Sequence, residues 1–472
     1  MKRLITLCFV CLLFAVLVFE ARAEIKLPSI FSDNMVLQQQ SEVAVWGWAK
    51  PNAVVTITGS WDRKSCNAKS DAQGYWRVKI TTPAAGFTPY TLTVSGDGKA
   101  VTLRNILIGE VWVCSGQSNM AMTMSGCPDE PVAGGPEAIV SSTNTGIRCF
   151  TVARIAKVTP QDDCSGTWDI ANPQTTPDFT ATGYFFGRMI NQVLNVPVGL
   201  INASSGGTSI QTWMTPHSLK DFPEIPIPAP DADISIPYHI PTAHYNAMIH
   251  PVEGYGIRGA IWYQGESNRS EPALYVKLFD AMVREWRQLW GVGEFPFYYC
   301  QIAPYNYGGG LNSGYIREAQ AKGMTTTPNT GMAVLMDAES SHTIHPAKKR
   351  DAGERMALWA LAKTYGMEKM HYRSPELKTF EIEGRVAIVT FDLGAYPGLT
   401  TYGKEIQNFR IAGKDKQFYP AKAAHVGNKV YLFSPFVTEP VAVRYCFDDT
   451  SATELFTVEG NLPVSSFRTD EW

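Results

Sequence analysis

The chain has 472 residues, of which 45% are hydrophobic and 18% are charged, and its formal net charge is −3. This composition is typical of a folded globular protein that is long enough for two or three domains. The near-neutral charge gives no support to nucleic-acid binding, which requires clustered Lys and Arg, so we expect a small-molecule partner and no nucleic acid.

Residues 1–23 have the three parts of a secretory signal peptide. Lys2 and Arg3 form a charged start, residues 4–19 form an apolar core, and Ala21-Arg22-Ala23 is a small-residue cleavage site. The apolar run is short for a membrane span. We therefore expect cleavage after Ala23 and an exported protein, periplasmic or extracellular, with no membrane association after cleavage.

Three regions follow along the chain. Residues 24–103 contain short runs such as "EVAVWGWA" and "VVTITG" between turn residues, which predicts an N-terminal β-sandwich domain. Residues 104–370 alternate apolar runs with helical patterns, which predicts an α/β domain with a mostly parallel sheet. Residues 371–472 return to strand patterns and predict a C-terminal β-rich domain, which we expect to pack with the first.

The clearest helical patterns lie in the α/β region. Residues 182–195 and 274–291 each place apolar side chains on one face, and Gly291 is a typical residue to follow a helix end. A third helix is expected to start at Pro346, because proline is favoured at the first helical position. Residues 221–251 contain too many prolines for a regular element. We interpret this segment as a rim of the functional site, with a disordered insertion as the alternative.

Four of the predicted strands end in polar turns, with the sequences "SGQSNM", "NASSGGTS", "YQGESN" and "DAESSHTIHP". Ligands of open α/β sheets bind beyond the carboxyl ends of the strands. Together these turns hold a hydroxyl, glycines, amides, carboxylates and an imidazole, which are the groups that acyl transfer needs. In this interpretation Ser118 is the nucleophile and His345 the base. Gly206 or Gly207 offers a backbone N–H to the oxyanion, and Asn268 offers its amide.

The context of Ser118 excludes one kind of hydrolase. A nucleophile elbow of the α/β-hydrolase type reads G-x-S-x-G. Here Gly116-Gln117-Ser118 is followed by Asn119 and Met120, so the second glycine is missing. A structural turn remains the alternative for Ser118 taken alone, and a loop or cap residue is the alternative for His345.

The motifs "GQSNM", "SSGGT" leading to Trp213, "IWYQGESN" and "IHP" resemble the successive blocks of the SGNH (GDSL-like) hydrolases. They resemble more closely the sialate O-acetylesterase family and related acetylxylan esterases. The resemblance implies a flavodoxin-like three-layer α/β/α domain with N- and C-terminal β-sandwich elements. It also implies Ser118 as nucleophile, Gly207 and Asn268 in the oxyanion hole, and His345 as base, in the removal of acetyl groups from sugar hydroxyls.

The acid that orients His345 is not given by the resemblance. The wider superfamily usually has Asp three residues before its catalytic His, but that position is His342 here. Glu266 is the first candidate, because it shares a turn with Asn268. Asp337 is the second, and a Ser–His dyad with a backbone carbonyl is the third. His342 is either a substrate contact or a solvent-facing loop residue.

Further assignments concern substrate, metals and cysteines. Gln117, Gln264 and Trp213 are predicted to bind substrate, and core packing is the alternative for the aromatic residues of this region, which also include Trp262, Tyr263 and Tyr305. We expect no metal and no organic cofactor. The seven cysteines that follow residue 23 contain no C-x-x-C pair, so zinc-ligand spacing is absent from them. Cys127, Cys149 and Cys164 are close enough in sequence to offer a disulfide.

The sequence therefore predicts an exported serine esterase that removes O-acetyl groups from sugars, with sialic acid as the first choice of substrate. An acetylxylan esterase or another glycan acetylesterase is the alternative within the same class. A non-catalytic glycan-binding protein is the alternative from a different class, and the joint presence of serine, glycines, Asn and His argues against it.

Overall fold

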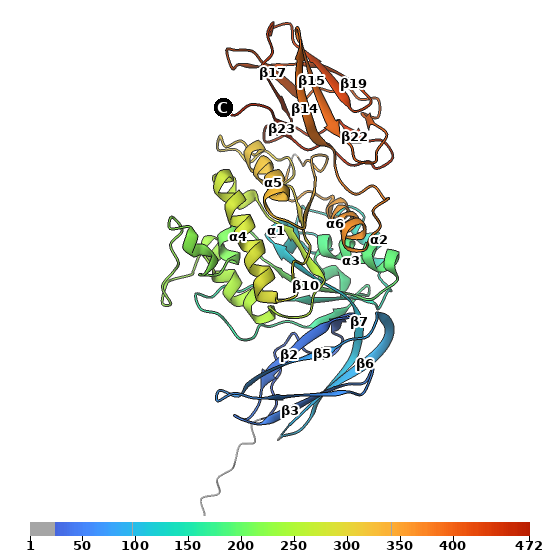
Figure 1. Ribbon diagram of the computed structural model, residues 1–472, viewed down its shortest axis with the longest axis vertical. Helices are drawn as coiled ribbons and strands as arrows, with labels where there is room; N and C mark the ends of the chain where they lie inside the picture. The colour runs from blue at the N-terminus through green and yellow to red at the C-terminus, as the bar shows by residue number, and fades with distance from the viewer. Residues whose placement is uncertain (1–23, 97, 341) are drawn as a thin grey trace, which may run out of the picture.

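The computed structural model describes residues 24–96, 98–340 and 342–472. The expected signal peptide lies outside these residues. Figure 1 shows an α/β region between two β-rich regions, which lie at opposite ends of the long axis. The expectation that the two β-rich regions pack together is therefore wrong, because the α/β region separates them. No helix in the described part of the chain is long and apolar enough to cross a membrane.

The N-terminal region is built from short antiparallel strands. β2 pairs with β5, and β3 pairs with both β4 and β6. Strand side chains alternate between two faces, and in β3 this alternation buries Val55 and Ile57 in one hydrophobic cluster with Val43 and Val45 of β2. The strands are β1 (Val36–Gln38), β2 (Glu42–Trp48), β3 (Val54–Gly59), β4 (Ser65–Lys69), β5 (Tyr75–Thr81) and β6 (Gly86–Ser95).

One strand, β7 (Val101–Gly116), joins this region to the α/β region. Its first half pairs antiparallel with β6 and parallel with β1, with Leu107 opposite Val36. Its second half lies in the middle of the parallel sheet. The boundary predicted between residues 103 and 104 falls inside this strand, so the two regions share one continuous hydrogen-bonded element.

The central sheet has the strand order β13-β12-β11-β7-β10-β8-β9. All neighbours are parallel except β9, which runs antiparallel to β8 at the edge. The five strands from β10 to β13 across β7 follow the doubly wound order 2-1-3-4-5, in which ligands bind near the first and third strands, here β7 and β11. The expected mixed α/β fold is confirmed. The remaining strands are β8 (Ile147–Thr151), β9 (Trp168–Ile170), β10 (Val198–Ser204), β11 (Gly259–Tyr263), β12 (Phe297–Cys300) and β13 (Thr330–Ala333).

Helices cover both faces of this sheet. Trp112 and Cys114 of β7 pack in one cluster with α3 and α6, whereas Val111 and Val113 pack in another with α4 and α5. Parallel strands buried on both faces are apolar at successive positions, which explains the unbroken run "ILIGEVWVC". Figure 1 shows the two helix groups on either side of the sheet. The helices are α3 (Ala181–Leu194), α4 (Pro272–Trp290), α5 (Gly314–Thr326) and α6 (Lys349–Trp359).

Two of the three predicted helices have nearly the expected bounds. α3 matches the 182–195 pattern, and α4 ends before Gly291, which has a φ of 63° as expected for a helix-terminating glycine. The predicted start at Pro346 is wrong, because α6 begins at Lys349. The Pro346 carbonyl instead accepts a hydrogen bond of 2.8 Å from Nζ of Lys349, which holds residues 344–346 as a loop.

The Pro-rich segment 221–251 forms only single helical turns. The helical elements of the described chain other than α3, α4, α5 and α6 are all short. They are α1 (Ser118–Ala121), α2 (Gly135–Val140), the 3₁₀ turns η1 (Thr176–Asp178), η2 (Ile210–Trp213), η3 (Ser218–Asp221), η4 (Pro237–His239), η6 (His250–Val252) and η7 (Glu266–Asn268), and the π turns η5 (Tyr245–Ile249) and η8 (Ala360–Thr364).

The C-terminal region consists of two four-stranded antiparallel sheets, β14-β15-β20-β19 and β18-β17-β21-β23, and the pair β16–β22. Their strands are β14 (Glu376–Glu383), β15 (Val386–Asp392), β16 (Leu399–Thr400), β17 (Phe409–Ala412), β18 (Phe418–Pro420), β19 (Lys422–Val426), β20 (Lys429–Phe433), β21 (Ala442–Tyr445), β22 (Phe456–Thr457) and β23 (Phe467–Arg468).

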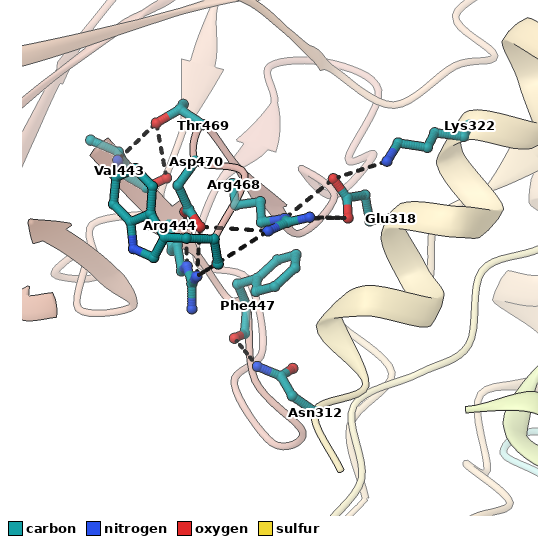
Figure 2. Close-up of polar contacts among 10 residues, drawn as sticks. Asn312, Glu318, Lys322, Val443, Arg444, Phe447, Arg468, Thr469 and Asp470 are labelled. Carbon is teal, nitrogen blue, oxygen red and sulfur yellow. Dashed lines mark hydrogen bonds and ion pairs between the residues drawn. The ribbon is translucent and has the colours of Figure 1, made fainter. Parts of the chain in front are cut away.

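Ion pairs and hydrogen bonds fasten this region to α5 (Figure 2). Nη2 of Arg468 lies 3.1 Å from Oε2 of Glu318 on α5, and Nδ2 of Asn312 donates to the Phe447 carbonyl at 3.0 Å. Within the region, Asp470 accepts from Arg444 at 2.6 Å. The C-terminal region therefore has a fixed place on the α/β region. All seven cysteines in the described part of the chain are free thiols, so Cys127, Cys149 and Cys164 form no disulfide.

The buried guanidinium of Arg148 on β8 provides a test of how the N-terminal and α/β regions are joined. Arg148 is 2% exposed, and it donates to the Asn34 carbonyl at 2.7 Å and to Oδ1 of Asn105 at 3.2 Å. We expect Arg148→Met to lower the free energy of unfolding by about 2–4 kcal/mol, because buried acceptors lose a charged donor. Urea unfolding followed by circular dichroism measures the change. Arg104→Met, at an exposed position of β7, is the matched control and is expected to stay within about 0.5 kcal/mol. Equal effects of the two changes would contradict this role.

Candidate active site

The turn that carries Ser118 is fixed by the ends of both neighbouring strands. Gly116 has a φ of 131°, and a Cβ atom there would lie 2.2 Å from the Tyr263 carbonyl oxygen, so only glycine fits. The Gln117 N–H donates to the same Tyr263 oxygen at 2.9 Å, and the Ser205 N–H donates to the Gly116 carbonyl at 3.1 Å. Ser118 begins helix α1 directly after this turn and is half-buried. The hydroxyl is therefore presented where β7, β10 and β11 end.

His345 is bonded to a carboxylate that comes from a distant loop. Its Nδ1 atom lies 2.7 Å from Oε2 of Glu130, and Oε1 of Glu130 accepts a hydrogen bond from the Thr343 hydroxyl. Burial opposes ionisation of Glu130, but the hydrogen bonds from Thr343 and His345 more than offset it, and the pKa of this carboxyl is lowered. The Ala133 N–H donates to the Ala347 carbonyl at 2.9 Å, which docks the two loops together.

The side chain of Asn119 brings the histidine loop to the serine turn. Its Nδ2 atom donates to the Ile344 carbonyl at 3.2 Å, so the residue after Ser118 is bonded to the residue before His345. Among the described residues no hydrogen bond joins Ser118 Oγ to the His345 ring. Catalytic hydrogen bonds are often long without substrate, and the two groups lie in adjoining loops.

Below these loops lies a buried polar network. Asn119 is 1% exposed; its Nδ2 atom also donates to Oε1 of Glu266 at 2.7 Å, and its Oδ1 atom accepts from Nζ of Lys349 at 2.6 Å. Burial raises the pKa of Glu266 and lowers the pKa of Lys349 to about 7. The network thus links the turn after β11, the turn after β7 and the first turn of α6.

This geometry corrects the predicted orienting acid. Glu266, the first candidate, bonds Asn119 and not His345, because Glu130 occupies the Nδ1 side of the ring. Asp337, the second candidate, forms two bonds of 2.7 Å with the guanidinium of Arg355. The backbone-carbonyl dyad is also wrong, since the ring has a carboxylate partner.

Three backbone N–H groups lie around Ser118 without an acceptor within the described residues, namely those of Ser118, Gly206 and Gly207. A Cβ atom on Gly206 would lie 3.5 Å from the Ser118 Cβ, so Gly206 is directly beside the nucleophile. Gly207 has a φ of 72°, and a Cβ atom there would face Tyr238 at 3.6 Å. Both glycines therefore stay candidates for the oxyanion hole.

Asn268 lies in a second buried amide network. Its Oδ1 atom accepts from the Ile210 N–H at 2.9 Å and from Nε2 of Gln264 at 2.7 Å, and its Nδ2 atom donates to Oε1 of Gln211 at 2.9 Å. One Nδ2 hydrogen is thus used inside the protein and the second is left for another acceptor. The role of Asn268 toward the oxyanion stays a prediction.

Gln117, Gln264 and Trp213, the predicted substrate contacts, are all buried side chains with bonds inside the protein, and their contact with a substrate stays a prediction. Gln117 is 2% exposed, and its Oε1 atom accepts from the N–H groups of the turn after β11. Gln264 and Trp213 are 0% exposed and both bond to Thr208. These residues hold the strand-end turns in place. Trp262 and Tyr263 are likewise fully buried, and His342 is an exposed loop residue.

A crevice of about 500 Å³ opens beside the two glycines. Pro237 and Tyr238 contribute to it, so part of the Pro-rich segment 221–251 is a rim of the site, as expected. Arg154 also lines it; its Nη2 atom donates to the Ala121 carbonyl at 2.7 Å, and no acidic side chain pairs with it among the described residues. The lining is Arg154, Ile155, Ala156, Ser205, Gly206, Gly207, Pro237, Tyr238 and His244.

Glu130 and Arg154 are the functional candidates that the sequence analysis missed. The signal for Glu130 was indirect: the position three residues before His345 is not acidic, and Thr343 follows it, so the acid had to come from elsewhere. Nothing in the motif "CPDEP" marks which distant carboxylate docks on the loop. In the part of the chain that the structure describes, no three His, Cys, Asp or Glu side chains are grouped to hold a metal ion.

Comparisons with known proteins identify the family of this chain. The family model described as carbohydrate esterase, sialic acid-specific acetylesterase, matches residues 108–361. The mouse sialate O-acetylesterase is 28% identical over 445 residues, which is 81% of this chain and 80% of that protein. The human sialate O-acetylesterase is 29% identical over 433 residues, which is 82% of this chain and 80% of that protein.

A solved structure is similar over almost the whole chain. It is a carbohydrate acetylesterase from Xanthomonas citri, with 36% identity and a TM-score of 0.86, and the match covers 95% of this chain and all of that one. The family match spans more than half of the chain and includes Ser118, Gly206, Asn268 and His345. The chain therefore belongs to the sialic acid-specific acetylesterase family of carbohydrate esterases, and it is a carboxylic ester hydrolase.

Proposed function

We propose that this protein is an exported serine esterase that removes O-acetyl groups from sugars, and that acetylated sialic acid is its preferred substrate. The family match and the relatives support sugar deacetylation. The observation that carries the catalytic proposal is the bond between His345 and Glu130, in a loop that Asn119 joins to the turn of Ser118.

The first step is activation of the nucleophile. Oε2 of Glu130 accepts a hydrogen bond from the Nδ1–H group of His345, which leaves Nε2 of the ring free to take the proton of Ser118. The lowered pKa of Glu130 keeps this carboxylate ionised at neutral pH, so it stabilises the imidazolium that forms. Ser118 Oγ then bonds to the acetyl carbon, and the carbonyl oxygen becomes an oxyanion.

The second requirement is a set of donors for that oxyanion. The unpaired N–H groups of Ser118, Gly206 and Gly207 are the donors we propose, together with the second Nδ2 hydrogen of Asn268. His345 gives its proton to the leaving sugar oxygen. Water then attacks the acetyl group on Ser118 with the same base, and acetate leaves.

The choice of acetylated sialic acid rests on Arg154. This cation lies in the crevice beside Gly206 without an acidic partner in the described chain, and a sugar carboxylate is the kind of group that a guanidinium binds. An acetylated neutral sugar such as xylose has no carboxylate for this cation to bind. A non-catalytic glycan-binding protein has no need for the bond between His345 and Glu130.

The finer description of the fold and the location are also proposals. We infer that the α/β region is a flavodoxin-like three-layer α/β/α domain of the SGNH type, and that the two β-rich ends are β-sandwich elements. The strand order 2-1-3-4-5 and the helices on both faces support this. The pattern of residues 1–23 supports export to the periplasm or the extracellular space.

Ser118→Ala is expected to lower kcat by roughly 10⁴ to 10⁶-fold, because the nucleophile is lost. Hydrolysis of a small aryl acetate by the purified variant measures the loss, and circular dichroism shows whether the fold persists. A folded variant that keeps its activity would exclude Ser118 as the nucleophile.

Glu130→Gln is expected to lower kcat by at least about 100-fold at neutral pH, since an amide no longer fixes the required tautomer of His345. Glu266→Gln is expected to lose less, because the glutamine oxygen still accepts the hydrogen bond from Asn119. Asp337→Asn is the control, and its activity per folded molecule is expected to stay within about threefold, since the Asp337 carboxylate pairs with Arg355 and not with His345. A larger loss for Glu266→Gln than for Glu130→Gln would reverse the assignment of the acid.

Arg154→Gln tests the substrate. We expect kcat/KM on acetylated sialic acid to fall about 10 to 100-fold relative to kcat/KM on an acetylated neutral sugar such as xylose, because a hydrogen bond between charged groups is lost. Released acetate is the measurement. Lys157→Gln, which removes an exposed cation from the same segment, is expected to leave this ratio unchanged. An unchanged ratio in Arg154→Gln would favour a neutral glycan as the natural substrate.

A further inference from the structure

A second cleft lies where the N-terminal region meets the α/β region. Its volume is about 300 Å³, and the ends of β2 and β5 form one wall. The other wall comes from the loop around Asp162 and from the turn that follows η5. The cleft is lined by Trp46, Trp48, Tyr75, Arg77, Asp162, His250, Pro251 and Glu253.

Aromatic side chains dominate the wall formed by the strands. Trp48 and Tyr75 are opposite each other in the register of β2 and β5, and their ring centroids are 6.2 Å apart with an angle of 63° between the planes. Both rings are only half-buried. Half-buried aromatic rings present apolar faces together with a polar edge, which suits a sugar ring because its C–H groups lie on one face and its hydroxyls at the rim.

Polar groups of both signs surround these rings. Arg77 and Asp162 are exposed, and the Arg77 guanidinium lies 5.1 Å from the Trp46 ring centroid. His250 Nδ1 lies 2.9 Å from Oε1 of Glu253, and this hydrogen bond raises the pKa of His250. Nζ of Lys26 also lies 5.3 Å from the Trp48 ring centroid, and the carboxylates of Asp162 and Glu253 balance the charges of Lys26 and Arg77. The cleft therefore suits a neutral sugar residue and not an anionic one.

Two segments of the chain line both the cleft and the crevice beside Ser118. Residues 154–162 and 237–253 each contribute to both hollows, and the two segments are bonded together between them. The Lys157 N–H donates to the Ala243 carbonyl and the Gln161 N–H to the Asn246 carbonyl, both at 2.9 Å. Six peptide units connect Ala156 in the crevice with Asp162 in the cleft, so their Cα atoms lie at most about 22 Å apart. A chain of several sugar residues reaches across this distance.

We propose that this cleft is a second sugar-binding site, which holds a neutral residue of an oligosaccharide whose acetylated residue lies at Ser118. The inference rests on the proposed deacetylation of sugars and extends it from single sugars to chains. Binding at a remote site contributes to catalysis when it helps to position the acetyl group.

The first experiment compares chain lengths in two substrate series. One series is acetylated sialic acid, free and at the end of an oligosaccharide of six sugars. The other is acetylated xylose and acetylated xylohexaose. In the series that the enzyme cleaves, we expect kcat/KM for the six-sugar substrate to exceed that for the single sugar at least about tenfold. Equal values with good hydrolysis overturn the second site alone, whereas no acetate from either series overturns the proposed function.

The second experiment changes residues of the cleft and measures the hydrolysis of the preferred six-sugar substrate. We compare kcat/KM for the six-sugar substrate with kcat/KM for the single sugar. Trp48→Ala is expected to lower this ratio about tenfold, mainly by raising KM for the six-sugar substrate. Asp162→Ala changes an exposed loop residue, so it tests the same cleft with little risk to the fold, and we expect a smaller fall in the ratio. The matched control is Trp61→Ala, because Trp61 is also half-buried in the N-terminal region but does not line the cleft.

A direct binding measurement separates binding from a structural effect. In Ser118→Ala protein, titration with the same six-sugar chain without acetyl groups is expected to change the tryptophan fluorescence, and Ser118→Ala combined with Trp48→Ala is expected to bind at least about fivefold more weakly. If the Trp61 control moves the kinetic ratio as much as Trp48→Ala and Asp162→Ala, or if Trp48→Ala leaves binding unchanged, the cleft does not hold the chain.

Discussion

Strand β7 pairs with β6 and β1 over its first half and with β10 and β11 over its second half, so its position is set by two sheets at once. Displacement of one region would strain the pairing in the other. The strand ends at Gly116, where the Tyr263 carbonyl leaves no room for a side chain, and Ser118 follows two residues later. The hydroxyl thus has a fixed place because the strand before it cannot slide. In the first half of β7, the Arg148 guanidinium adds hydrogen bonds to Asn105 and to the nearby Asn34 carbonyl.

The loops beyond β7 are fixed by buried polar groups. Apolar packing alone does not orient a loop, whereas a hydrogen bond in a low-dielectric interior does, because leaving it unmade costs about 1–3 kcal/mol. Asn119 uses both ends of its amide in this way, toward Glu266 and the Ile344 carbonyl on one side and toward Lys349 on the other. Burial of a charged carboxylate and an amine is unfavourable without partners. Glu266 and Lys349 both bond the Asn119 amide, so each has a buried partner in this network.

Features with a repeating pattern could be predicted from the sequence. The helices at 182–195 and 274–291 follow from apolar residues on one face, and the parallel sheet follows from strands that are apolar on both faces. The polar turns after β7, β10 and β11 were predicted from where apolar runs end. What the pattern does not contain is the direction of a side chain in a loop. Gln117, Gln264 and Trp213 lie at those turns but point into the protein, because the turns themselves need internal hydrogen bonds. Pro346 was misjudged for a similar reason, since its carbonyl is held by Lys349 before the helix begins.

Glu130 shows the same limit for a catalytic candidate and explains how the site is assembled. More than two hundred residues separate it from His345 along the chain, and the two meet because the loop before α2 docks on the loop before α6. The three candidate groups therefore come from three separate segments of the chain, and hydrogen bonds between these segments help to align them. The crevice beside Ser118 has a rim of its own. Segments 154–162 and 237–253 form that rim and also reach the aromatic cleft. A sugar chain bound at both places would be positioned at two points, and the binding free energy of the remote residue would then be available to hold the acetyl group against Ser118.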